Sequence, residues 1–203
     1  ALVNAGGVLI AFAEGRRFSC SDFGTSPSGV ANNGTNGQHD LVYRRSTTDG
    51  AGWGPLSRAV DVDAVFPPSR FPTQHGSAVW DVTPVFDRDT GEVFVFFAGP
   101  GRQAGERTDI YALSSTDSGS SWGAPANLSA SCAPGGGSLT PGDGAGVQVS
   151  TGRLIVPLYG AGISVCFSDD HGRTWKVSRG KVGGILATEP EITEQFGRPG
   201  DAP

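Results

Sequence analysis

The sequence predicts an all-β chain built from repeated hairpin units, as in a β-propeller. One short pattern with an Asp, a Gly and a Trp at nearly fixed offsets occurs three times, at residues 47–53, 115–122 and 168–175. Repetition of one supersecondary unit is typical of propellers and repeat arrays. The 32 glycines and 14 prolines among 203 residues suit many short strands joined by tight turns. No stretch shows the sustained 3.6-residue periodicity of a helix.

Strand-like runs alternate with turn signals along the chain. One such run leads directly into each copy of the pattern, and a hairpin is predicted before both the second and the third copy. The spacing of the copies corresponds to blades of roughly 50 residues, so the chain is expected to hold three to four blades. Most closed propellers need more blades than that. In order, the predicted strands are 7–13, 40–46, 83–87, 92–97, 110–114, 146–149, 153–159 and 163–167.

Each residue type in the repeated pattern has a local structural role. The Asp side chain caps backbone N–H groups, the Gly adopts a left-handed turn conformation, and the Trp packs beneath the turn. The second and third copies fit Ser-x-Asp-x-Gly-x-x-Trp without a gap, whereas the first, counted from Asp49, is one residue short before Trp53. We interpret Asp49, Asp117 and Asp170 as structural residues rather than catalytic ones.

The repeated pattern resembles the Asp box of the sialidase superfamily, whose boxes lie at the rim of the blades. This resemblance implies a six-bladed β-propeller, of which the chain would hold only part. We therefore expect a partial propeller domain over residues 1–194 and an unstructured tail over 195–203. The low-complexity stretch 132–144 is interpreted as a flexible surface loop, with the rim of a site as the alternative.

Composition excludes several other classes of protein. The net charge is −5 and no basic run occurs, which argues against nucleic acid as a partner. No run of about 18 apolar residues is present, so no transmembrane segment is expected.

Cys20, Cys132 and Cys166 are odd in number, widely separated and without metal-site spacing, and we interpret them as free thiols in or near the core.

The cellular compartment is left open by the sequence. Glycosylation sequons at Asn33 and Asn127 matter only in a secreted protein, and the expectation leans to a secreted or lysosomal one. The chain begins without Met, which we interpret as a cut rather than a natural start.

The resemblance becomes specific at residues 10–16, Ile-Ala-Phe-Ala-Glu-Gly-Arg. This segment is similar to the exo-sialidase strand that ends in a Glu and an Arg facing the substrate, which implies a substrate-binding role for Arg16. Asp22 follows six residues later, where the family has its acid/base Asp on a mobile loop. A Gly/Ser/Asn-rich insertion before the next strand leaves Asp40 as a rival for that role, and counting from Arg16 favours Asp22.

Three further residues are implied to face the substrate. Asp81, in Trp-Asp-Val-Thr-Pro, matches an Asp or Asn that reaches the C4 region of the sugar. Glu106 lies near the position of another substrate-facing Glu. Tyr159 matches a Tyr that lines the pocket in animal-type sialidases, and core packing is the alternative interpretation for it.

Glu189 and Glu194 keep the five-residue spacing of two glutamates in the family. There, the first Glu is the base partner of a Tyr nucleophile, which sialidases use in place of a carboxylate. A phenol with a pKa of about 10 needs such a base at neutral pH. Neither that Tyr nor the three arginines that clamp the sugar carboxylate has a match in this chain, so we expect a fragment that is inactive by itself.

The resemblance thus implies an exo-α-sialidase, a retaining hydrolase that removes terminal sialic acid from glycoproteins, oligosaccharides or gangliosides. The expected partner is a sialylated glycan, and no cofactor or metal is implied. Two alternatives remain: a non-catalytic Asp-box propeller that binds glycans or proteins, and a glycosidase on a similar propeller that acts on another sugar.

Overall fold

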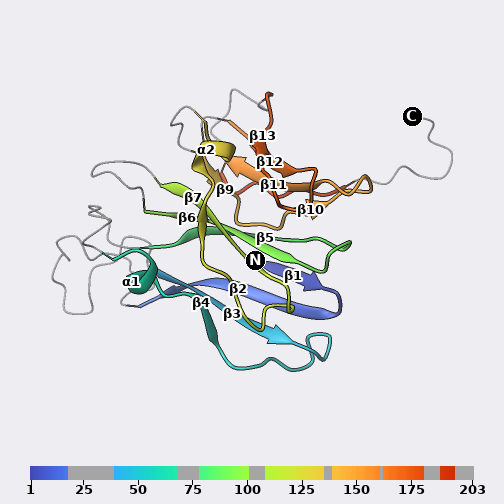
Figure 1. Cartoon of the computed structure of the whole chain (residues 1–203). Coiled ribbons are helices and arrows are strands. Elements are labelled where there is room, and N and C mark those ends of the chain that lie inside the picture. Colours follow the sequence, from blue (N-terminus) through green and yellow to red (C-terminus); the bar gives the residue numbers. More distant parts are fainter. Residues whose placement is uncertain are drawn as a thin grey trace.

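The computed structural model describes residues 1–17, 39–67, 78–100, 108–134, 139–160, 162–180 and 188–194. Within these ranges the chain forms three antiparallel sheets that follow one another in sequence (Figure 1). The all-β prediction is therefore confirmed. The predictions made for Cys20, Asp22, Glu106 and the tail 195–203 lie outside the described residues.

Each sheet contains an antiparallel path of four strands in chain order. The first path is β1 (Leu2–Ala5), β2 (Val8–Arg16), β3 (His39–Ser46) and β4 (Ser57–Val60). The second is β5 (Trp80–Phe86), β6 (Val93–Gly99), β7 (Asp109–Ser115) and β8 (Ala126–Asn127). The third is β10 (Val147–Gln148), β11 (Leu154–Tyr159), β12 (Ser164–Ser168) and β13 (Lys176–Val177), and β9 (Thr140–Pro141) also pairs with β11.

Besides the strands, the described residues include two single-turn helices, α1 (Val62–Val65) and α2 (Ser129–Cys132). The side chain of Asp61 caps α1 by accepting hydrogen bonds from the backbone N–H groups of Asp63 and Ala64. None of these helices, within the part of the chain that the structure describes, is long and apolar enough to cross a membrane.

The core consists of two apolar clusters, one between the first and second sheets and one between the second and third. Strand β6 is buried along its whole length and serves both clusters. Its alternate side chains Val93, Val95 and Phe97 belong to the first cluster, whereas Phe94 and Phe96 belong to the second. Because strand side chains alternate between faces, one apolar strand holds two neighbouring sheets together.

All three copies of the repeated pattern form the turn between the third and fourth strands of their own sheet. In the second copy, the Ser115 hydroxyl accepts from the N–H of Gly119, and the Asp117 carboxylate accepts from the N–H of Ser121 and from its hydroxyl. Ser168 and Asp170 make the same bonds in the third copy.

The first copy has a different register from the one that the sequence predicted. Ser46 accepts from the N–H of Gly50, and Thr48 Oγ1 accepts from the N–H of Gly52 at 2.8 Å. Thr48 therefore occupies the position of the capping Asp. Asp49 is the left-handed residue that follows, with φ of 52°. The copy is thus not one residue short; it carries a Thr in place of the Asp.

The Trp of each later copy packs onto the preceding sheet. Trp122 lies edge-on to Phe12 and Tyr43 of the first sheet, and Trp175 lies edge-on to Phe94 and Phe96 of the second. Trp53, in the first sheet, is 40% exposed. The Trp is therefore an inter-sheet anchor as well as part of its own turn.

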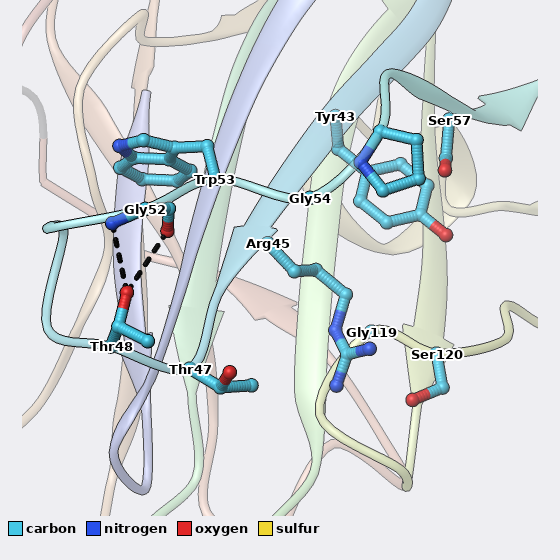
Figure 2. Close-up of a pocket in the computed structure, with 11 residues that line it drawn as sticks. Tyr43, Arg45, Thr47, Thr48, Gly52, Trp53, Gly54, Ser57, Gly119 and Ser120 are labelled. Atoms are coloured by element: carbon cyan, nitrogen blue, oxygen red, sulfur yellow. Dashed lines mark hydrogen bonds between the residues drawn. The ribbon is translucent and has the colours of Figure 1, made fainter.

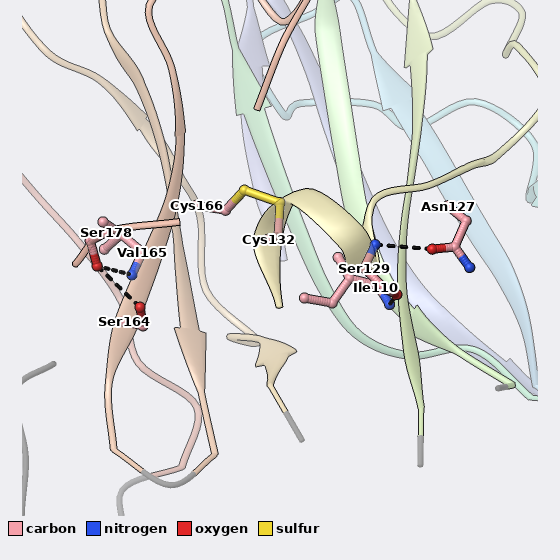
Figure 3. Close-up of a disulfide and its surroundings, with 8 residues drawn as sticks. All are labelled: Ile110, Asn127, Ser129, Cys132, Ser164, Val165, Cys166 and Ser178. Atoms are coloured by element: carbon pink, nitrogen blue, oxygen red, sulfur yellow. Dashed lines mark hydrogen bonds between the residues drawn. A yellow bond between two sulfur atoms is a disulfide. The ribbon is translucent and has the colours of Figure 1, made fainter. Parts of the chain in front are cut away.

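A disulfide joins Cys132 to Cys166, which corrects the prediction of free thiols (Figure 3). Cys132 ends α2, which follows the last strand of the second sheet, and Cys166 lies on β12 of the third sheet. The two residues are 34 positions apart in sequence and are brought together only by the packing of one sheet on the next. Spacing in the sequence alone could not have revealed this pairing.

Candidate functional site

The strands of the described residues have one end next to the Asp-box turns and the other end opposite these turns. In the first sheet, Leu9 pairs with Ser46 next to the box turn, whereas Arg16 pairs with His39 at the far end. Tyr159 likewise ends β11, opposite the box turn that follows Ser168. Asp81 lies near the start of β5, beside the end of β6. The predicted site residues therefore lie at the strand ends opposite the Asp boxes.

Glu14 connects the first sheet to the second at this end. One carboxylate oxygen, Oε2, accepts from Arg16 Nη2 at 3.1 Å, and the other, Oε1, accepts from the backbone N–H of Asp81 at 3.3 Å. The buried ring of His39 lies 3.5 Å from Oε2. Burial raises the pKa of Glu14, and the hydrogen bond from Arg16 opposes that effect.

Asp81 lies at the centre of the cluster. Burial raises its pKa to about 7, and the negative charges of Asp143, Glu14 and Glu189 act in the same direction. A hydrogen bond with Tyr159 opposes this rise. The carboxyl group is therefore poised near neutral pH, which is typical of functional sites.

Tyr159 and the segment around Glu189 close the cluster from the third sheet. Burial raises the pKa of Tyr159 to about 12, and the charges of Asp81 and Asp143 add to this effect. Pro190 approaches Gly142 so closely that a Cβ at Gly142 would lie 2.2 Å from the Pro190 carbonyl oxygen. Only glycine fits there, so the segment that carries Glu189 is seated directly against the stretch that carries Asp143.

Backbone strain marks the same residues. Five described residues other than glycine have positive φ, and three of them are the left-handed residues of the box turns, Asp49, Ser118 and His171. The other two are Asp81, with φ of 56°, and Glu189, with φ of 54°. Left-handed backbone in a residue other than glycine tends to gather at functional sites, where the surrounding structure maintains it.

Asp40 is engaged elsewhere. Its carboxylate accepts from Arg17 Nε and Nη2 at 2.9 and 2.6 Å and from the backbone N–H of Val62 at 2.9 Å, and Arg58 Nε lies 3.2 Å away. With only 5% of its side chain exposed, Asp40 is a buried structural anion. Asp22 therefore stays the prediction for the acid/base role.

The structure thus brings together Arg16, Asp81, Tyr159 and Glu189 from separate parts of the sequence. Sequence reasoning missed Asp143, because it lies in the Gly-rich stretch 132–144 that was interpreted as a surface loop. Leu139, Pro141 and Gly142 of that stretch are buried, so its described end forms the rim of the site instead. The Pro-Gly-Asp-Gly sequence was the only signal available.

One group in the described residues has the spacing of metal ligands, namely Asp87, Asp89 and His171 at the box end. Its atoms already bond one another: His171 Nδ1 lies 2.8 Å from Asp87 Oδ2, and Gln148 Nε2 donates to both aspartates at 2.7 and 3.0 Å. We interpret it as a hydrogen-bond network that joins the second and third sheets.

Comparison with known proteins identifies the family. Residues 31–197 match the BNR repeat-like domain family. The chain is 29% identical to an exo-alpha-sialidase of Aspergillus fumigatus over 90% of this chain and 46% of that protein. It is 31% identical to human Sialidase-4 over 68% of this chain and 33% of that protein.

Solved sialidase structures share the fold. A Trypanosoma rangeli sialidase in complex with 2,3-difluorosialic acid has a TM-score of 0.66 at 21% identity, covering 96% of this chain and 32% of that one. The intramolecular trans-sialidase of Ruminococcus gnavus has a TM-score of 0.68 at 15% identity, covering 90% and 60%.

The chain belongs to the BNR repeat-like family that includes these sialidases, as its Asp boxes predicted. Its three sheets have the fold of part of a sialidase-type β-propeller. The chain spans from a third to about half of the length of the curated relatives that it matches.

Proposed function

We propose that this chain forms one side of the active site of an exo-α-sialidase, a retaining hydrolase of terminal sialic acid on glycoproteins, oligosaccharides or gangliosides. The observation that carries the proposal is the meeting of Arg16, Asp81, Tyr159 and Glu189 at the strand ends opposite the Asp boxes. Family membership supports it, because the curated relatives are named as sialidases.

Each residue has a proposed role in this site, and that of Tyr159 is to line the pocket. Arg16, oriented by Glu14, binds the polar groups of the sugar, and Asp81 binds near C4. Glu189 is the base that takes the proton of a Tyr nucleophile supplied from outside this chain. Asp22 and Glu106, outside the described residues, are proposed as the acid/base residue and a further substrate-binding residue.

The described cluster has more acidic groups than basic ones, so it would need further, basic residues to bind an anionic sugar. Glu14, Asp81, Asp143 and Glu189 contribute carboxyl groups, whereas Arg16 contributes one positive charge. A sialate carboxylate entering this cluster alone would meet like charge, and arginines recognise a carboxylate far better. We therefore propose that the clamp arginines and the Tyr lie in parts of the longer protein, and that this chain alone does not turn over substrate.

The test compares the 203-residue chain with the longer protein on a fluorogenic α-sialoside. We expect hydrolysis by the longer protein, with the first anomer seen by NMR retaining the substrate configuration, and a rate no faster than blank for the chain alone. Turnover by the chain alone would overturn the proposed division of the site. A longer protein that binds sialyllactose without hydrolysing it would instead support a non-catalytic propeller.

A further inference from the structure

We propose a second ligand site at the Asp-box end of the molecule, for a small saccharide that carries a carboxylate. It is a cavity of about 470 Å³ between the first and second box turns (Figure 2). That volume is in the range that holds a small ligand. The strands β2 and β3 separate it from the candidate active site by roughly 20–25 Å, at about 3.3 Å per residue.

Arg45 is the charged group in this cavity. Its Nε donates to the backbone oxygen of Ser118 at 2.8 Å, which fixes the side chain across the gap between the two sheets. Within the part of the chain that the structure describes, its two terminal nitrogens have no hydrogen bond. Figure 2 shows the guanidinium group directed toward Gly119 and Ser120. A guanidinium group held in this way is prepared to bind a carboxylate.

The rest of the lining suits the other parts of a sugar. Thr47 and Ser57 contribute hydroxyl groups without a hydrogen bond among the described residues, and Tyr43 and Pro55 contribute apolar surface. The described lining includes no Asp or Glu, so Arg45 leaves the cavity positively charged. One cation among hydroxyl groups and apolar walls favours a ligand with a carboxylate on a polyhydroxylated ring.

The test follows backbone amide signals of the ¹⁵N-labelled chain during titration with glucuronate, glucose and acetate. Glucose has the ring without the charge, and acetate has the charge without the ring. We expect glucuronate to shift the amides of Thr47, Ser57, Gly119 and Ser120 saturably, with an affinity at least about tenfold above that of either control compound.

Variants assign the effect to Arg45. Arg45→Ala should weaken glucuronate binding at least about tenfold, since it removes a charge-assisted hydrogen bond. Ser120→Asp should do the same while leaving the Arg45–Ser118 bond in place, which keeps the test valid if Arg45→Ala does not fold. Arg173→Ala removes the same charge from the exposed turn of the third copy, which does not line this cavity, and should change the affinity by less than about twofold.

Several results would overturn the proposal. If acetate bound as tightly as glucuronate, the cavity would be a simple anion site. If glucose bound as tightly as glucuronate, Arg45 would have no role in binding. A loss in Arg173→Ala equal to that in Arg45→Ala would show non-specific attraction. Shifts confined to Asp81 and Tyr159 would assign the ligand to the other end of the molecule. No readout depends on hydrolysis, so the proposal fails or stands separately from the proposed function.

Discussion

Trp175 of the third sheet lies edge-on to Phe96 of the second, with ring centroids 4.7 Å apart and an interplanar angle of 73°. Trp122 has the same relation to Phe12 of the first sheet, at 5.6 Å. The box Trp therefore links each sheet to the one before it. Trp53 stands at the same position of the repeat in the first sheet and is 40% exposed.

This packing predicts that a Trp→Ala substitution lowers the free energy of unfolding by different amounts in the different copies of the repeat. Trp175→Ala should lower the free energy of unfolding by about 3–5 kcal/mol, because it empties a buried contact between two sheets. Trp53→Ala should cost clearly less, about 1–2 kcal/mol, since 40% of that residue is already exposed. Urea denaturation of both variants measures the difference. Equal costs would contradict the assignment of the Trp as an inter-sheet anchor.

The Asp-box register gives a second prediction. Thr48→Val keeps the shape of the side chain but removes the acceptor for the Gly52 N–H, and should cost about 1 kcal/mol of stability. Asp49→Asn should have little effect, because Asp49 is exposed and Asn tolerates left-handed backbone. Thermal unfolding followed by circular dichroism compares them. If Asp49→Asn lost more stability than Thr48→Val, the capping residue would be Asp49, as the sequence predicted.

The main strands were predictable because they are apolar runs bounded by turn residues. Strand β6 is an example, with predicted bounds 92–97 and observed bounds Val93–Gly99. The edge strands β1, β4, β8 and β13 were missed, and so was β9. They are two to four residues long and take their structure from pairing with a neighbouring strand rather than from their own sequence.

Three candidate site residues could be proposed because they lie next to a recognisable strand, whereas Glu189 was proposed only from its spacing to Glu194. Arg16 and Tyr159 end such strands, and Asp81 precedes one. Asp143 had no such marker, because it lies between glycines that allow close approach of the segment after Glu189. Its contribution depends on tertiary packing, which no local pattern in one sequence encodes.

The disulfide predicts a thiol count and a stability change. The chain has three cysteines and two form the bridge, so thiol titration of the unreduced, denatured chain should find one thiol, and three after reduction. A bridge over 34 residues constrains the unfolded chain by about 4 kcal/mol, which reduction should remove. Cys20→Ser is the control, since it leaves the bridge intact. Three thiols before reduction would contradict the bridge.

Asp81 makes stability depend on pH. Its pKa is about 7 in the folded protein, above the usual 3.8, so the folded state holds a proton that the unfolded state releases between these values. Stability should therefore fall as pH rises from about 4 to about 7, by at most about 4 kcal/mol. Asp81→Asn should abolish this fall and exceed the parent chain in stability at pH 8.

Denaturation midpoints at pH 4, 6 and 8 test this dependence on Asp81. Asp49→Asn makes the same change at another left-handed residue, one that is exposed, and is the matched control. A pH dependence that persists unchanged in Asp81→Asn would locate the titrating group elsewhere in the cluster, and Glu14→Gln would then be the next variant to measure.

Substitutions of Asp22 and Asp40 in the longer protein should have different effects, one on the rate and the other on stability. Asp22→Ala should lower kcat on the order of a hundredfold or more, because it removes the proposed general acid, and should flatten the alkaline limb of the pH–rate profile. Asp40→Asn should instead cost about 3–5 kcal/mol of stability, because it breaks a buried ion pair with Arg17, and the enzyme that remains folded should keep the parent pH–rate profile. Rates normalised to the folded fraction distinguish the two effects. A normalised loss in Asp40→Asn beside an unchanged Asp22→Ala would reverse the acid/base assignment, since the proton would then have to come from the group bound by Arg17.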